Sequence, residues 1–219
     1  MKSWDIETIP NVDLIDSLPE PEVALGNVKD PEKISAKIAE AKQKQIDKMA
    51  LSPFYGRICS FATFGANGGL YKTIMEISDA AEIEIVSEML ELFQIGEEGT
   101  NLIITWNGYN FDFPFVYLRA ALLKIPLPPN CPSLRYWQKK FSNNPHCDMM
   151  QELSGWGKEK MCGLDEAGKR FLGKSKTPHD FTKFIELIKS GKGDEIGIYN
   201  LGDAETTYEL YQILNLYLF

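Results

Sequence analysis

Short runs of alternating or continuous apolar residues predict the strands of this chain. Residues 2–7 predict a short first strand. The β-rich segments 58–64 and 70–77 flank a glycine-rich stretch at 65–69, which is typical of a hairpin. The apolar run 102–106 predicts a fully buried central strand, because such strands show no polar alternation.

Helical spacing marks the longer elements. Ile83, Val86, Leu90 and Phe93 predict one face of a helix that opens at Ser78-Asp79, runs to Ile95 and is closed by Gly96 and Gly99. A last helix is expected over 194–216, with a packed stripe of Leu201, Ala204, Tyr208, Tyr211 and Leu214. Further helices are expected after Asp112, at 163–172 and at 181–190.

Two segments fit this scheme less simply. Residues 11–31 are rich in proline and acidic side chains and predict an extended connection, after which Asp30 caps a helix that has Pro31 in its first position. That helix carries Ile34, Ile38, Ala41 and Ile46 near one face and ends by Pro53 and Gly56. Residues 126–145 hold five prolines and predict a loop around 134–141.

The order of these elements predicts a single α/β or α+β domain over residues 1–219 with a mixed sheet. Residues 11–52 are an insertion whose role the pattern does not assign. A content of 44% hydrophobic and 25% charged residues is ordinary for a globular protein. The absence of a long apolar run and of a signal sequence predicts a cytoplasmic protein without a membrane partner.

Cysteine and histidine spacing argues against a zinc site. The four cysteines include no Cys-x-x-Cys pair, which predicts reduced, half-buried thiols. His146 and His179 have no partner at metal-ligand spacing and are expected in loops or on the surface. The net charge of −8 disfavours a nucleic-acid partner, but residues 158–192 carry nine basic and five acidic side chains. That basic run is either a solvated face or a track for a phosphate backbone.

Asp5 and Glu7 form the first candidate for chemistry. Residues two apart on a strand point to the same face, so these carboxylates project together while Trp4 and Ile6 face the opposite layer. Paired carboxylates suit Mg²⁺ or Mn²⁺. An exposed acidic pair on an edge strand explains most Asp-x-Glu sequences equally well.

Two later segments carry the other candidates. Asp112 follows the buried strand at the start of a helix, where it is either a site residue or an N-cap. Tyr199 and Asp203 lie four apart on the last helix, so they share a face, which we expect to be offset from the packed stripe and open to a cleft. A hydrogen-bonded Tyr–Asp pair that stabilises the helix start is the structural alternative.

Together the three segments resemble the exonuclease motifs of the DEDDy group in the ribonuclease H-like superfamily, and most of all the proofreading exonuclease domain of family B DNA polymerases. The resemblance spans nearly the whole chain. The matching residues are Trp4-Asp5-Ile6-Glu7-Thr8 in the first motif, Trp106-Asn107 with Phe111-Asp112-Phe113-Pro114-Phe115 and Arg119 in the second, and Tyr199-Asn200-Leu201-Gly202-Asp203 in the third.

The resemblance implies an α/β, ribonuclease H-like fold and a metal-dependent 3′–5′ exonuclease that releases nucleoside 5′-monophosphates. Its catalytic residues would be Asp5, Glu7, Asp112, Tyr199 and Asp203, and the four carboxylates would hold two Mg²⁺ or Mn²⁺ ions. Tyr199 would orient the attacking water, because a phenol with an ordinary pKa of about 10 is a poor base.

The same resemblance implies the substrate contacts. Asn107, Phe111 and Thr8 would bind the terminal nucleotides, and Tyr109 is a further candidate for stacking on bases. The implied substrate is single-stranded DNA or a frayed 3′ end. RNA remains open as a substrate, as does a catalytically idle nucleic-acid-binding module. The remaining length holds no polymerase domain, so a free-standing exonuclease is expected.

Overall fold

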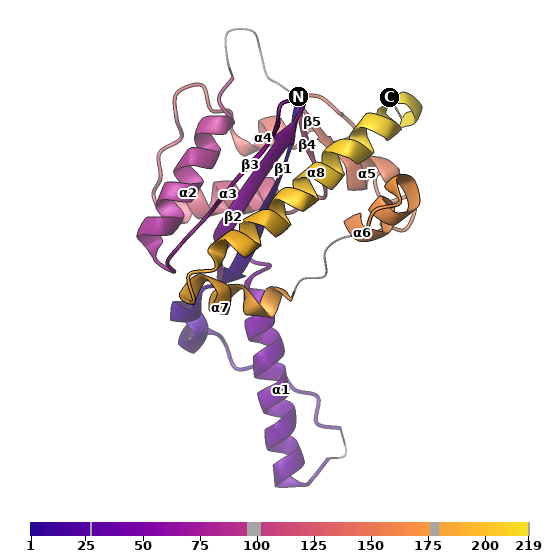
Figure 1. Cartoon of the computed structure of the whole chain (residues 1–219). Coiled ribbons are helices and arrows are strands. Elements are labelled where there is room, and N and C mark those ends of the chain that lie inside the picture. Colours follow the sequence, from indigo (N-terminus) through magenta and orange to yellow (C-terminus); the bar gives the residue numbers. More distant parts are fainter. Residues whose placement is uncertain (27, 96–101, 176–179, 219) are drawn as a thin grey trace.

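A computed structural model describes residues 1–219 except 27, 96–101, 176–179 and 219. A five-stranded mixed sheet forms its centre, in the order β3-β2-β1-β4-β5 (Figure 1). Strand β1 pairs antiparallel with β2 and parallel with β4. The strands are β1 (Lys2–Pro10), β2 (Gly56–Gly65), β3 (Gly68–Thr73), β4 (Ile103–Thr105) and β5 (His146–Asp148).

Helices cover both faces of the sheet. The long helix α8 crosses one face and contacts β1 to β4, while α2 and α3 pack against the other (Figure 1). This arrangement confirms the predicted α/β architecture. The helical elements are η1 (Val12–Ser17), α1 (Pro31–Met49), α2 (Asp79–Leu92), α3 (Asp112–Leu122), α4 (Leu134–Trp137), α5 (Met149–Leu153), α6 (Leu164–Ala167), the π-helical η2 (Gly168–Leu172), η3 (Phe181–Lys183), α7 (Phe184–Lys189) and α8 (Gly193–Leu218).

The first strand is longer than the pattern predicted. Residues 8–10 continue to pair with 56–58 of β2 after a register shift between Glu7 and Thr8. The predicted hairpin of β2 and β3 is present, but β3 ends at Thr73 and not at Ile77. Strand β1 lies between β2 and β4 in the sheet, and it pairs with β4 at Lys2 and Ser3.

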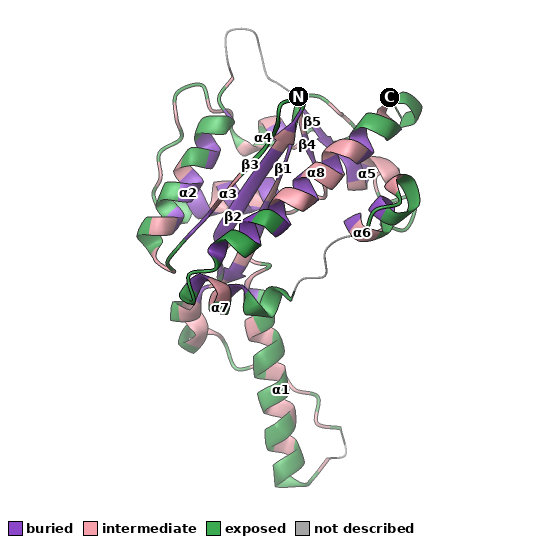
Figure 2. Cartoon of the chain, viewed as in Figure 1, coloured by how far each residue is buried: buried purple, intermediate pink, exposed green. Residues whose placement is uncertain are grey.

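The core lies on both sides of the sheet, and purple marks the buried strand residues in Figure 2. On the α2/α3 side the Trp4 ring meets Phe93 and Phe113 edge-on, at centroid distances of 4.8 and 4.9 Å. A second apolar cluster lies between the sheet and the C-terminal half of α8, around Ile104, Met149 and Leu210. Both faces of the sheet thus carry buried apolar residues, whereas the edge strand β3 is largely exposed.

Helix α2 keeps its predicted start and most of its predicted face, since Val86, Leu90 and Phe93 are buried. The Ser78 hydroxyl accepts from the Ala81 amide, as an N-cap should. Ile83 is 38% exposed, whereas Glu82 is fully buried in its place. The helix ends at Leu92, before Ile95. Gly96 and Gly99, which were expected to close it, lie outside the described residues.

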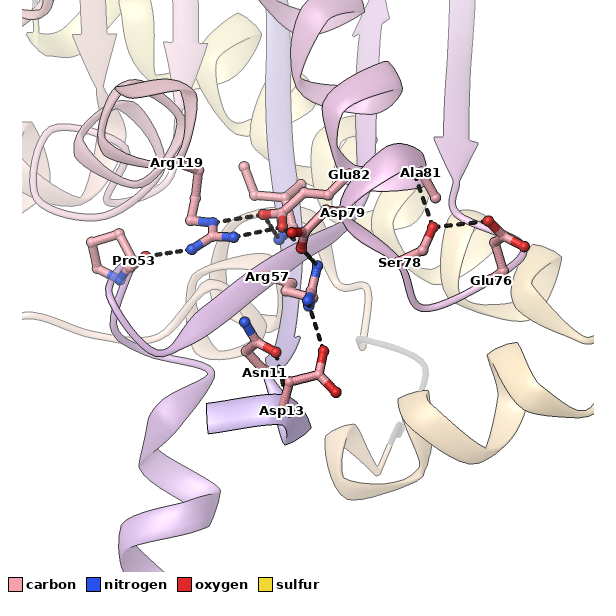
Figure 3. Close-up of polar contacts among 11 residues, drawn as sticks. Asn11, Asp13, Pro53, Arg57, Glu76, Ser78, Asp79, Ala81, Glu82 and Arg119 are labelled. Carbon is pink, nitrogen blue, oxygen red and sulfur yellow. Dashed lines mark hydrogen bonds and ion pairs between the residues drawn. The ribbon is translucent and has the colours of Figure 1, made fainter. Parts of the chain in front are cut away.

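Glu82 is buried because two arginines neutralise it (Figure 3). Arg119 of α3 donates from Nε and from one terminal nitrogen to the two carboxylate oxygens, both at 2.7 Å. Arg57 of β2 lies 3.5 Å from Oε2, and the Ile58 amide donates to Oε1 at 3.1 Å. This ionic cluster joins α2 and α3 to β2, since it draws a partner from each.

The ionic cluster also holds the inserted segment against the body. Arg57 donates to Asp13 of η1 at 3.0 Å, and Arg119 donates to the Pro53 carbonyl at 3.1 Å (Figure 3). These contacts hold the two ends of the insertion, near Asp13 and Pro53, against β2 and α3. The prediction of an extended chain over 11–31 is wrong for residues 12–17, which form a short 3-10 helix capped by Asn11.

Between these ends the insertion projects from the body as a helical arm, residues 18–49 (Figure 1). The predicted cap is confirmed, because Asp30 accepts from the Glu32 amide with Pro31 in the first helical position. In α1, which the structure describes in full, only Met49 is buried. The predicted apolar face is only half-buried, because the thin segment 15–21 packs on it in place of a sheet.

Residues 126–148 differ most from the pattern. Four residues of the expected loop form α4, and Trp137 at its end is buried. The strand β5 was not predicted, because three residues are too few to show a period of two. The predicted helices at 163–172 and 181–190 are confirmed, the first as α6 with the π-helical η2.

Candidate active site

The carboxylates of β1 lie where strand geometry predicted. Asp5 and Glu7 share the sheet face covered by α8, and Trp4 points to the opposite side. Glu7 is buried and Asp5 is half-buried, so the two acids are not an exposed pair, although β4 pairs with β1 at Lys2 and Ser3 and not beside them. The exposed-edge explanation for the acidic pair therefore does not hold in this structure.

Helix α8 brings a third carboxylate to this pair. Asp5, Glu7 and Asp203 each offer an oxygen, and the three oxygens lie within 4.8 Å of one another. Asp203 is 4% exposed and Glu7 is 9% exposed. Three negative charges this close repel one another strongly in a partly dry site, so the arrangement favours a bound cation. Clustered carboxylate oxygens suit hard divalent ions such as Mg²⁺.

Asn200 orients one of these carboxylates. Its side-chain amide donates to Asp5 Oδ2 at 3.1 Å, although 195 positions separate the two residues. Asn200 is fully buried, and its own Oδ1 has no hydrogen-bond partner in the part of the chain that the structure describes. The sequence placed Asn200 inside a motif without assigning a role to it, because the partner is distant in sequence.

The face of α8 that carries Tyr199 and Asp203 was wrongly predicted. It is not offset toward an open cleft, because Tyr199 and Asp203 are both buried against the body of the protein. The Tyr199 ring contacts Phe181 and Phe184 edge-on, at 5.8 and 6.3 Å. Gly197 permits α8 to lie close to β3, since a Cβ there would lie 2.0 Å from a ring carbon of Tyr71 of that strand.

Asp112 reaches β1 from the start of α3. Its Oδ1 accepts from the Ile6 amide at 3.2 Å, beyond the point where β4 stops pairing with β1. The N-cap alternative is wrong, because Asp112 is the first helical residue and Phe111 precedes it without a side-chain cap. Asp112 does not belong to the cluster of three, and burial, with a smaller effect from the Asp148 charge, raises its pKa to about 8.

Asp148 holds the loop that precedes Asp112. It was not predicted as a site residue, because the three-residue strand β5 that carries it shows no pattern in the sequence. Its carboxylate accepts from the amides of Asn107 and Tyr109 at 3.0 and 2.9 Å. It also caps α5 by accepting from the next backbone amides. Burial raises the pKa of Asp148, and these donated hydrogen bonds oppose the rise. The 107–112 loop is therefore fixed from β5.

His146 was expected in a loop or on the surface, and this is wrong. It is 4% exposed in β5, and its Nδ1 donates to the Trp137 carbonyl at 3.0 Å. A neutral ring then accepts at Nε2 from the Thr105 hydroxyl, 2.8 Å away. Burial lowers the pKa of His146 to about 4. His179 lies outside the described residues.

The residues expected to bind nucleotides occupy different environments. Asn107 is half-buried in the left-handed region at φ 69°, and its Oδ1 accepts from Asn110 at 3.2 Å. Phe111 packs against Phe115 at the margin of the core, at 5.3 Å. Thr8 donates to the Ala50 carbonyl at 2.7 Å, so its hydroxyl holds the base of the arm.

The basic run at 158–192 is divided among several partners. Among the described residues, lysines of the run form the ion pairs Lys169–Asp165, Lys174–Glu209, Lys183–Asp180 and Lys192–Glu195. Lys176 lies outside the described residues. The geometry of the run therefore agrees better with a solvated face than with one continuous track.

The four cysteines are unpaired, but Cys59 and Cys147 are fully buried and not half-buried. Within the described ranges, no helix has both the length and the apolar content that a membrane crossing requires.

Comparison with known proteins gives the family context of this site. A family described as predicted 3′–5′ exonuclease related to the exonuclease domain of PolB matches residues 52–217. DNA polymerase 1 of Pyrococcus abyssi is 27% identical over 146 residues, which cover 60% of this chain and 19% of that protein. DNA polymerase 1 of Sulfolobus acidocaldarius is 30% identical over 146 residues, covering 60% of this chain and 16% of that protein.

The fold has a solved counterpart. The family B DNA polymerase of Pyrobaculum calidifontis superposes with a TM-score of 0.60 at 16% identity, over 98% of this chain and 24% of that one. The sheet and its flanking helices therefore have the ribonuclease H-like fold of a family B polymerase exonuclease domain. Because the family match includes α8 and the 107–112 loop, the chain belongs to the family of predicted 3′–5′ exonucleases related to the exonuclease domain of PolB.

Proposed function

We propose that this chain removes nucleotides from the 3′ end of single-stranded or frayed DNA, using two divalent cations, Mg²⁺ or Mn²⁺. The observation that carries the proposal is the group of three carboxylates, Asp5, Glu7 and Asp203, whose oxygens lie within 4.8 Å of one another. The relatives are DNA polymerases, which favours DNA over RNA as the substrate. The family match favours cleavage at a 3′ end over cleavage within a strand.

Each residue has a distinct part in this proposal. Asp5, Glu7 and Asp203 hold one cation, and Asp5 with Asp112 holds the second. Bound cations lower the pKa of an attacking water and neutralise charge on the phosphoryl group and the leaving oxygen. Tyr199 orients the water, and the packing of its ring against Phe181 and Phe184 supports a fixed direction for its hydroxyl. Asn107, Phe111 and Thr8 contact the terminal nucleotides.

The two other candidate functions have weaker support. A catalytically idle binding module would not need the four acids of the site, and all four are present in the sequence. Cleavage of RNA needs no different metal site, so only a comparison of substrates separates it from cleavage of DNA.

The test uses a 5′-labelled single strand in Mg²⁺ or Mn²⁺, with DNA and RNA versions of one sequence. The wild-type protein should shorten the DNA stepwise from its 3′ end and leave a circular strand intact. Asp203→Ala should lower the rate more than about 100-fold, because even the outer partners of metal ligands cost about 10–100-fold. Glu205→Ala, on the same helix but outside the carboxylate cluster, is the matched control and should retain the rate. An Asp203→Ala protein with the wild-type rate contradicts the proposal.

A further inference from the structure

Three aromatic rings from separate segments gather beside the loop that leads to Asp112. Trp156, which follows α5, contacts Tyr109 of this loop and Phe141, which follows α4. Both contacts are edge-on with centroids 5.3 Å apart. Phe141 is 69% exposed. We call Tyr109, Phe141 and Trp156 the aromatic platform.

Polar contacts hold two members of the platform, Trp156 and Tyr109. The Trp156 indole donates to Glu152 at 3.2 Å. The backbone of Tyr109 is fixed on both sides, because its amide donates to Asp148 at 2.9 Å and its carbonyl accepts from Gln138 at 2.7 Å. A ring surface held in advance loses little conformational entropy when a planar ligand stacks on it. The exposed Phe141 ring is the part that water reaches most freely.

A lysine lies beside one ring of the platform, Phe141, whereas the acidic Glu152 lies beside another, Trp156. The Lys140 ammonium lies 4.9 Å from the centre of the Phe141 ring, and the neighbouring Lys139 lies 4.8 Å from that of Tyr136. Residues 135–160 carry five basic and three acidic side chains, and one of these acids, Asp148, is buried. The whole chain has a net charge of −8, so this segment is a local exception.

The geometry points to the aromatic platform as the surface that binds the single-stranded part of the substrate, with bases stacked on Phe141 and Trp156 and phosphates beside Lys139 and Lys140. This inference rests on the proposed function, because the platform would bind the same strand whose 3′ end lies at the carboxylates. Exposed rings interleaved with lysines suit a sequence-tolerant strand, because every base has a stacking face and every phosphate a negative charge.

The position of the platform agrees with this use. Tyr109 precedes Asp112 by three residues, so their Cα atoms lie within about 10 Å of each other along the loop. One carboxylate, Asp148, accepts hydrogen bonds from the Tyr109 and Asn107 amides and so fixes both to β5. A DNA strand bound at the platform therefore lies next to the loop that carries Asp112.

The test measures binding apart from cleavage. Fluorescence anisotropy with a 5′-labelled 12-nucleotide DNA strand, without divalent metal, gives the Kd of the full chain carrying Asp203→Ala. Adding Phe141→Ala should raise this Kd about tenfold, in line with the loss of one stacked base. Lys140→Gln should raise it several-fold and flatten its dependence on salt.

A matched control lies on the far side of the molecule. Leu70 is 49% exposed on β3, the sheet edge opposite β5, and Leu70→Ala should leave the Kd unchanged. Because Phe141 and Lys140 are surface residues, both variants should keep the wild-type melting temperature. An unchanged Kd in Phe141→Ala and Lys140→Gln overturns the inference even if the wild-type protein degrades DNA. Failure of the wild-type protein to degrade any strand overturns the proposed function instead.

Discussion

At the scale of single residues, Asn200 shows how a neutral side chain acts on a charged site. It donates one amide hydrogen to Asp5 and so fixes the direction in which that carboxylate presents its other oxygen. An outer partner of this kind raises the affinity of a ligand set for a metal, because the ligand need not be ordered when the metal binds.

Replacing Asn200 should therefore weaken metal binding. Asn200→Ala should raise the Mn²⁺ concentration for half-maximal exonuclease activity about tenfold, with a smaller change in the rate at saturating metal. A metal titration of the initial rate measures both. The control is Ile198→Ala, two residues away on the same helix and 62% exposed, which should leave the titration unchanged. Equal half-saturating concentrations in Asn200→Ala and the wild type would show that the hydrogen bond has no such role.

Residue identities alone gave part of the site. The pairing of Asp5 with Glu7 followed from the two-residue period of a strand, which needs no tertiary information. Asp148 and His146 were missed or misplaced, because a carboxylate or an imidazole within a short polar segment looks the same in sequence whether it is buried or exposed. Their burial depends on β5 and α4, which were not predicted.

At the scale of elements, the ionic cluster around Glu82 decides how α2 and α3 meet β2. Glu82 lies on a helix face where the hydrophobic pattern predicted only apolar residues, and two arginines make its burial possible. Patterns of polarity treat such a residue as solvent-exposed, which is why Ile83 was placed on the buried face by mistake. The β2–β3 hairpin was predicted correctly, because two β-rich segments flank a glycine-rich turn in the sequence.

Removal of the shared acid should destabilise the fold. Glu82→Ala leaves Arg57 and Arg119 buried without their common partner, and breaking a buried pair in this way costs about 3–5 kcal/mol. Urea denaturation measures the change in the free energy of unfolding. The control is Glu84→Gln on the same helix, which breaks an exposed ion pair with Lys72 and should cost less than about 1 kcal/mol. Similar losses in the two variants would contradict a structural role for the cluster.

At the scale of the whole molecule, the helical arm and the body are unequal in their contribution to stability. None of the described residues in 22–41 is buried. Close to the body, Lys42 donates to Glu20 and Gln45 donates to the Pro19 carbonyl. The two segments of the arm are therefore in contact there. The base of the arm, in contrast, contacts Arg57 and Arg119 through Asp13 and Pro53.

Shortening the arm beyond these contacts should therefore leave the body folded. Replacement of residues 22–41 by a short Gly-Ser linker should lower the free energy of unfolding by less than about 1 kcal/mol, because none of the described residues in this range is buried. Urea denaturation followed by circular dichroism measures this change. A loss of several kcal/mol, or loss of cooperative unfolding, would show that the outer arm is part of the folding unit.

The sequence by itself determined the features that follow from local geometry: the strand that presents Asp5 and Glu7 together, the helix that carries Tyr199 and Asp203 one turn apart, and the alternation of strands and helices. The tertiary structure alone decided which of these faces meet. Asp203 joins Asp5 and Glu7 only because α8 crosses β1, and Asn200 reaches Asp5 across 195 positions. Local periodicity is set by backbone geometry within a few residues, whereas such contacts depend on how all the layers pack.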